Sequence, residues 1–159
     1  MRRLTLNPYA SGLSLLARRE LTSSQLRDRL TRKGFTSKVV DHTIQRLTKE
    51  GALDDRRTAG IYARRAALIK HRGPRRAILD IEAIGVARKI ARDAVSQVYK
   101  EADTQLIIQR ALNRRLTGRV RDRAHFQKLY QYLVRQGFDG SLAYSVLKTH
   151  STDGTCPED

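Results

Sequence analysis

The chain has 159 residues and a formal net charge of +16, because 32 Lys and Arg residues outnumber 16 Asp and Glu residues. That surplus favours a polyanionic partner, such as nucleic acid, an acidic protein surface or an anionic membrane. The sequence has no apolar run of bilayer-spanning or signal-peptide length, and its single cysteine excludes an internal disulfide, so we expect a cytoplasmic protein with no membrane partner.

Helical periodicity runs through the chain, without the alternating pattern that is typical of strands. A first helix is expected over about residues 10–19. The next helix carries Leu26 and Leu30 on one face, and it ends at Gly34, which suits the left-handed backbone that follows a helix. A third helix follows, with Thr36 as its expected cap. The apolar stripe of that helix consists of Val39, Val40, Ile44 and Leu47.

This helix–glycine–helix unit occurs three times. Its elbows are Gly34 and Phe35, Gly85 and Val86, and Gly137 and Phe138, at intervals of 51 and 52 residues. The apolar position four residues before each glycine is Leu30, Ile81 or Leu133. With one more helix before each unit, the sequence predicts an all-α fold of three tandem three-helix modules, about nine helices in all. We expect a basic lead-in (residues 1–9), three modules (residues 10–53, 54–101 and 102–150) and a disordered tail (residues 151–159).

Residues 51–55 are predicted to form the joint between the first two modules. Gly51 ends a helix, Leu53 fills the seam between modules, and Asp54 or Asp55 caps the next helix. Two adjacent carboxylates also fit a metal or acid/base site, but no His or Cys lies nearby at ligand spacing. We therefore interpret the acidic pair as a cap.

The opening helices of the second and third modules are expected over residues 56–71 and 104–116. Their spacing places Ile69 and Leu106 on the inward faces.

Basic side chains lie away from these apolar faces. Pro74 fits the first turn of a helix that opens with two arginines, and helix N-termini attract anions. The alternative for each basic residue is an ordinary solvated surface. Tyr130 and Tyr132 are candidates for stacking on bases, although their helical spacing fits a core or a seam better. The candidate binding residues are Arg27, Arg32, Lys33, Arg64, Arg65, Arg72, Arg75, Arg76, Arg110, Arg114, Arg115 and Arg119.

The sequence predicts no catalytic, cofactor or metal site. It contains neither a glycine-rich phosphate loop nor a dinucleotide fingerprint, and its four histidines are scattered. We therefore expect a binding protein rather than an enzyme.

Three segments resemble the RecX family of recombinase regulators: residues 26–35, residues 51–57 with Ala59, and residues 72–76 with Ile78. The resemblance covers roughly residues 13–150 and implies an elongated, curved array of three modules. It also implies binding in the groove of the filament that RecA forms on single-stranded DNA, with inhibition of ATP hydrolysis, strand exchange and filament growth. We expect a monomer that contacts the single-stranded DNA directly or through the filament. The alternative is a sequence-independent nucleic-acid binder that acts without RecA.

Overall fold

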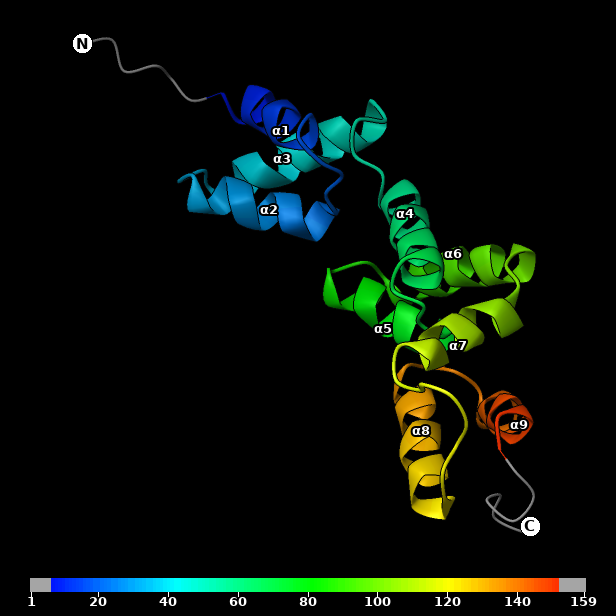
Figure 1. The fold of residues 1–159 in the computed structure, drawn as a ribbon. Helices are drawn as coiled ribbons and strands as arrows, with labels where there is room; N and C mark the ends of the chain where they lie inside the picture. Colours follow the sequence, from blue (N-terminus) through cyan, green and yellow to red (C-terminus); the bar gives the residue numbers. More distant parts are fainter. Residues whose placement is uncertain (1–6, 152–159) are drawn as a thin grey trace.

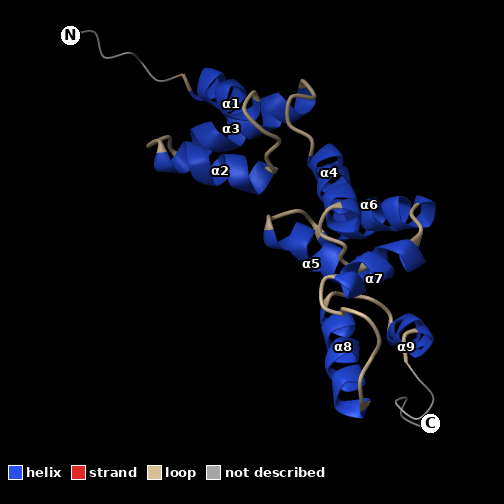
Figure 2. Ribbon diagram, in the orientation of Figure 1, coloured by secondary structure: helices blue, strands red, loops and turns tan. Residues whose placement is uncertain are grey.

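The computed structural model describes residues 7–151, which form nine α-helices and no strand (Figure 2). The helices are α1 (Pro8–Leu16), α2 (Ser23–Arg32), α3 (Ser37–Lys49), α4 (Asp55–Leu68), α5 (Pro74–Ala83), α6 (Arg88–Glu101), α7 (Thr104–Asn113), α8 (Arg123–Arg135) and α9 (Gly140–Thr149). They pack in successive groups of three, which follow one another along an extended, bent path (Figure 1). Within this part of the chain, no helix is long and apolar enough to cross a membrane.

Several helix ends differ from the expected ones. Helix α1 begins at Pro8, two residues early, because the Asn7 side chain caps it by accepting from the N–H of Tyr9 at 2.9 Å. Helix α4 ends three residues early, and His71 lies beyond its end with a left-handed φ of 50°. Helix α7 likewise ends at Asn113 rather than at residue 116.

The expected termini lie largely outside the described residues. Of the lead-in at residues 1–9, the structure describes Asn7, Pro8 and Tyr9, which cap and begin α1. Of the tail at residues 151–159, it describes Ser151, which forms an isolated bridge with Val120.

The three elbows share one set of hydrogen bonds. Gly34, Gly85 and Gly137 have φ values of 91°, 86° and 92°, a range that favours glycine. The backbone N–H of the residue after each glycine donates to the carbonyl of the residue five positions earlier. These hydrogen bonds run from Phe35 to Leu30 (3.3 Å), from Val86 to Ile81 (3.4 Å) and from Phe138 to Leu133 (3.3 Å). This is the Schellman arrangement, which satisfies carbonyls at a helix end.

Side chains cap several of the helices, and the cap predicted at Asp54 is among them. Thr22 and Gln25 form a reciprocal capping box, and the carboxylates of Asp54, Asp103 and Asp122 accept backbone N–H groups of α4, α7 and α8. Thr36 occupies the cap position of α3 but makes no capping hydrogen bond.

The core consists of two clusters. The first joins α1, α2 and α3 around Leu26, Leu30 and Leu53, while the second runs without a break from α4 to α9 and includes Ile81 and Leu133. All five predicted core residues are therefore buried.

Three residues expected to face inward are exposed: Val39 (40%), Ile69 (62%) and Leu106 (46%). Ile69 follows the last residue of α4, so it no longer continues the buried stripe of that helix. Val39 lies outside the buried face of α3, which contains Val40. Leu106 likewise lies outside the buried face of α7, which contains Ile107 and Ile108.

The elbow of the third module docks on the second module. The amide N–H of Gly73 donates to the carbonyl of Gln136 at 2.8 Å, and that of Arg75 donates to the carbonyl of Gly137 at 3.2 Å. A Cβ atom on Gly137 would lie 2.2 Å from the backbone N of Arg76, well inside contact distance. This elbow therefore needs glycine for its backbone angle and also for the close approach of α5.

The elbow of the second module docks on the first in the same way. The Thr22 hydroxyl donates to the carbonyl of Ile84 at 2.7 Å, and a Cβ atom on Gly85 would lie 2.3 Å from Cβ of Ser24. The acidic pair also takes part, since Asp55 accepts from the N–H of Ser23 at 2.7 Å. Each joint thus places an elbow against the N-terminal end of the middle helix in the preceding module.

Candidate binding surface

The predicted binding residues of the first module lie on and just after α2. Arg27 is engaged in an ion pair with Asp41 of α3. Arg32 and Lys33 are exposed at the C-terminal end of α2, beside Gly34, and have no ion-pair partner within residues 7–151. Arg32 and Lys33 are thus the available cations of this module's predicted set.

A larger group of cations gathers where the second module meets the third. We call this group the junction cluster, and it consists of Arg65, Lys70, Arg72, Arg76, Arg110 and Arg114. Arg114 comes from the end of α7 and donates to the carbonyls of Ile69 (2.8 Å) and Lys70 (3.3 Å). It therefore satisfies carbonyls beyond the end of α4 while it holds α7 against the turn between α4 and α5.

One carboxylate lies inside the junction cluster. Asp80 of α5 pairs with both Arg72 and Arg76, the latter at 3.2 Å. Arg72 is further held by its carbonyl, which accepts from the Tyr99 hydroxyl of α6 at 2.5 Å. Arg72 and Arg76 thus have structural roles within the second module, whereas neighbouring Arg75 is highly exposed and makes a 3.6 Å ion pair with Asp139 of the third module.

The pKa shifts show that positive charge is in excess here. Partial burial, and then the nearby guanidiniums of Arg72, Arg65 and Arg76, lower the pKa of Lys70. Burial followed by Arg114 and Arg110 also lowers the pKa of His71, against a smaller opposing effect of a hydrogen bond that the ring donates to the backbone of Leu68. Like charges disfavour the protonated form, so an anion bound at this surface would be stabilised by the same field.

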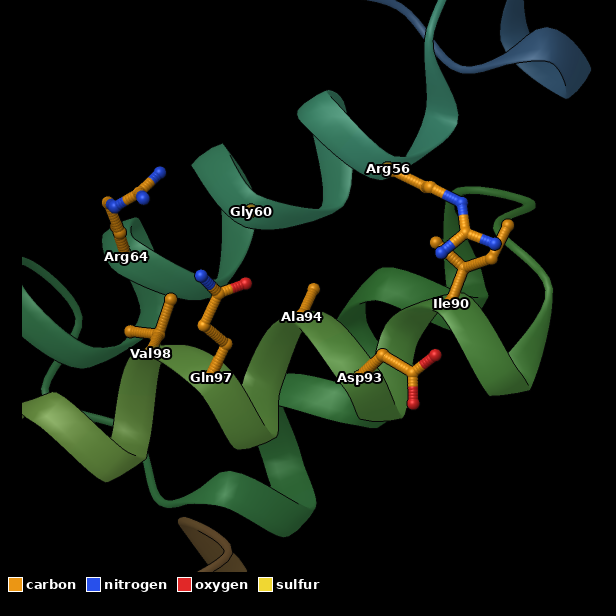
Figure 3. A pocket seen from close by; sticks show the side chains of 8 residues that line it. All are labelled: Arg56, Gly60, Arg64, Ile90, Asp93, Ala94, Gln97 and Val98. Carbon is orange, nitrogen blue, oxygen red and sulfur yellow. The ribbon is translucent and has the colours of Figure 1, made fainter.

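The face of α4 around Arg64 is of mixed charge. Arg64 and Arg56 lie at opposite ends of a groove of about 170 Å³ between α4 and α6, with Gly60 between them (Figure 3). Asp93 and Gln97 of α6 line its other side. This groove is therefore less suited to a polyanion than the junction cluster.

The third module carries a basic groove of about 360 Å³, which we call the α8 groove. It is lined by Arg115, His125, Lys128, Leu129, Tyr132 and Arg135. The guanidinium carbon of Arg115 lies 5.2 Å from the ring centroid of Tyr132, within the range of a cation–π contact. Arg119 is exposed on the loop between α7 and α8.

The two candidate tyrosines have different surroundings. Tyr132 lines the α8 groove, and its hydroxyl donates to the carbonyl of Ala111 at 3.4 Å. Both tyrosines pack against the core, but Tyr130 comes close to the start of α9, where a Cβ atom on Gly140 would lie 2.7 Å from its hydroxyl oxygen. Tyr132 is therefore the one placed for contact with a ligand.

The structure brings together some of the predicted site residues and separates others. Arg65, Arg72, Arg76, Arg110 and Arg114 meet in the junction cluster, although they come from different modules. Arg27, Arg32 and Lys33 of the first module lie apart from the junction cluster. Arg64, on α4, and Arg115, in the α8 groove, are also separate from it.

Sequence reasoning missed three residues of the α8 groove, His125, Lys128 and Arg135. A usable signal was present, because Lys128, Tyr132 and Arg135 are spaced i, i+4, i+7 on one helix face. Within the described residues, no group of three or more His, Cys, Asp or Glu side chains is placed to hold a metal ion.

Comparison with known proteins identifies the family. Residues 9–47 match the family model described as RecX, first three-helix domain. The regulatory protein RecX of Thermotoga petrophila is 34% identical over 143 residues, which cover 90% of this chain and 84% of that protein. The regulatory protein RecX of Syntrophotalea carbinolica is 30% identical over 140 residues, which cover 86% of this chain and 91% of that protein.

The fold agrees with that result. The crystal structure of RecX from Lactobacillus salivarius superposes with a TM-score of 0.77, at 18% identity, over 89% of this chain and 93% of that one. A second crystal structure, of a regulatory protein RecX, gives a TM-score of 0.76 at 21% identity. From its sequence relatives, this chain belongs to the RecX family of regulatory proteins.

Proposed function

We propose that this protein binds RecA and RecA–single-stranded DNA filaments in the filament groove. There it inhibits ATP hydrolysis, strand exchange and filament extension during DNA repair in the cytoplasm. Family membership supports the regulatory role. The observation that carries the proposed binding mode is the junction cluster, which places six cations with one paired carboxylate at the middle of an extended array.

The extended form suits a filament as partner. Consecutive modules that are joined through their elbows present successive surfaces along one path, as a helical groove with repeating subunits would require (Figure 1). A net charge of +16 favours association with an acidic surface or with DNA phosphates, and such attraction mainly raises the association rate.

The direct test is ATP hydrolysis by RecA on single-stranded DNA with sub-stoichiometric amounts of this protein. We expect a lower rate and shorter filaments in electron micrographs. An unchanged rate and unchanged filament length would refute the proposal.

The junction cluster is tested by reversing Arg65 and Arg110 to Glu together. Both side chains are exposed and have no ion-pair partner within residues 7–151, so the fold should tolerate the change. The matched control reverses the exposed Lys89 and Arg92 of α6, which alters the net charge equally. We expect the first variant to need several-fold more protein for half-inhibition, while equal losses in both variants would indicate only a general charge effect.

The α8 groove favours a second candidate function, sequence-independent binding of nucleic acid without RecA. Its basic side chains and its tyrosine match the features that hold single strands. Equal affinity for bare single-stranded DNA and for the filament, together with no effect on RecA, would support this second function over the first.

A further inference from the structure

The α8 groove occupies the position at which a following module would dock. Gly85 and Gly137 are 52 residues apart, so Gly73 and Arg76 of the second module correspond to His125 and Lys128 of the third. In the second module, these positions receive the next elbow, since Gly73 meets Gln136 and Arg76 lies against Gly137. In the third module no elbow follows within the described residues, and His125 and Lys128 line an open groove instead.

The groove has a chemistry different from that of the second joint. By the same correspondence, Asp80, which neutralises two arginines at the second joint, is replaced by Tyr132. The lining contains three cations (Arg115, Lys128 and Arg135) and a histidine, and it contains no carboxylate. A partner for this surface must therefore supply negative charge.

A second copy of this chain does not meet that requirement. Within residues 7–151 the one elbow that docks on no other module is Gly34, which has nothing within 4 Å of its Cβ position. It is preceded by the exposed cations Arg32 and Lys33, whereas the elbow at Gly137 is followed by Asp139, which pairs with Arg75. Docking Gly34 in the α8 groove would bring like charges together.

The side chains in the groove match the parts of a nucleotide strand. The half-buried ring of Tyr132 and the guanidinium plane of Arg115 provide flat faces on which bases stack. Lys128 and Arg135 lie about one helical turn on either side of Tyr132, at the spacing that puts all three on one face, and they offer charge to phosphates. An acidic protein segment would use the cations but would not need the stacking pair.

We propose that the α8 groove binds single-stranded DNA directly, with a base against Tyr132 and Arg115 and phosphates against Lys128 and Arg135. This inference deepens the proposed function by naming DNA as a direct ligand of the third module. Within residues 7–151 no elbow docks on this groove, so a surface that joins modules elsewhere is free to take a ligand.

The test measures binding of a fluorescent oligothymidylate by anisotropy, without RecA, over a range of salt concentrations. Reversing Lys128 and Arg135 to Glu should weaken binding by at least tenfold and reduce the slope of log affinity against log salt by about 1.4, at roughly 0.7 per phosphate contact. Tyr132→Leu should weaken binding by about 5-fold or more, while Tyr132→Phe, which keeps the ring, should bind like the unchanged protein. The Lys89 and Arg92 reversal again serves as the matched charge control.

Several results would overturn the inference. Unchanged DNA binding in the groove variants would exclude the site, and a loss no greater than that of the control would reduce it to a general charge effect. Displacement of the oligonucleotide by ATP alone at low concentration would indicate a nucleotide pocket. Loss of a concentration-dependent dimer in the variants, measured by sedimentation velocity, would indicate a second copy.

RecA inhibition is measured on the same variants, so the two proposals fail separately. If the groove variants lose RecA inhibition but bind DNA normally, the groove contacts protein and this inference is wrong. If they lose DNA binding but still inhibit RecA, the DNA site stands and the filament is bound elsewhere. If the unchanged protein binds DNA through the groove but never affects RecA, the proposed function fails and the DNA site remains.

Discussion

Replacing an elbow glycine by alanine should have very different consequences at Gly34 and at Gly137. The two residues share the same hydrogen-bonded turn and nearly the same φ, 91° and 92°. Their surroundings differ, because nothing lies within 4 Å of a Cβ atom at Gly34, whereas one at Gly137 would lie 2.2 Å from the backbone N of Arg76. Gly34→Ala is therefore a matched control, in which the free energy of unfolding should fall only because of the left-handed backbone conformation.

The magnitudes follow from these two environments. In both variants, a residue with a Cβ atom in the left-handed region costs about 1–2 kcal/mol. At Gly137 the clash is with backbone, which cannot rotate away, and overpacking of this kind costs about 1–3 kcal/mol more. Separation of the elbow from α5 also weakens the hydrogen bonds from Gly73 and Arg75, at about 0.5–1.5 kcal/mol each. We expect Gly137→Ala to lose about 2–6 kcal/mol more than Gly34→Ala, from overpacking together with the weakened hydrogen bonds.

Urea unfolding followed by circular dichroism at 222 nm gives the overall loss in each variant. Hydrogen exchange locates it, since the amides of Gly73 and Arg75 should lose protection in Gly137→Ala and keep it in Gly34→Ala. Equal destabilisation of the two variants, with these amides equally protected, would refute the close approach of the elbow to α5.

Three further substitutions test other parts of the structure. Leu30→Ala should lower the unfolding free energy by about 2–5 kcal/mol in urea, because Leu30 is fully buried in the first cluster. Thr22→Val should cost about 1–3 kcal/mol in the same assay, since it removes a helix cap and the hydrogen bond to Ile84; a loss below 0.5 kcal/mol would contradict that role. Burial and Arg114 hold the pKa of His71 below its usual value, so the unfolded chain binds more protons than the folded one in mild acid, and stability should fall as pH drops through about 6.5. His71→Asn, which tolerates the left-handed φ of 50°, should flatten that fall in urea titrations between pH 7.5 and 5.5, and an unchanged profile would contradict the assignment.

Much of the fold could be predicted because its signals are local. The elbow at Gly34 is closed by hydrogen bonds between residues at most five positions apart, and the burial of Leu30 follows from helical spacing. The cap at Asp54 likewise depends on the next three residues. Where the local pattern was ambiguous, as for Val39 and Leu106, the direction of the neighbouring helices decided which apolar residue was buried.

The candidate site could be predicted as a set of residues but not as an arrangement. Each arginine was identifiable from its position on a polar helix face. That Arg114 would reach the carbonyl of Ile69, 45 positions earlier, depends on how the third module is set against the second. The pair of Arg76 with Asp80 follows from i,i+4 spacing on α5, but the second pair of Asp80, with Arg72, depends on the path of the chain between α4 and α5.

The sequence by itself determined the repeated three-helix module, its glycine elbows, its core leucines and its excess of positive charge, because each of these follows from helical spacing or from composition. Only the tertiary structure decided that an elbow is also the joint between modules, since that role requires the backbone of Gly137 to lie against Arg76, far away in the chain. The same joint gathers the junction cluster, whereas the α8 groove is open because no elbow docks on the third module within the described residues. The junction cluster depends on the angle between modules, and that angle is set by long-range packing.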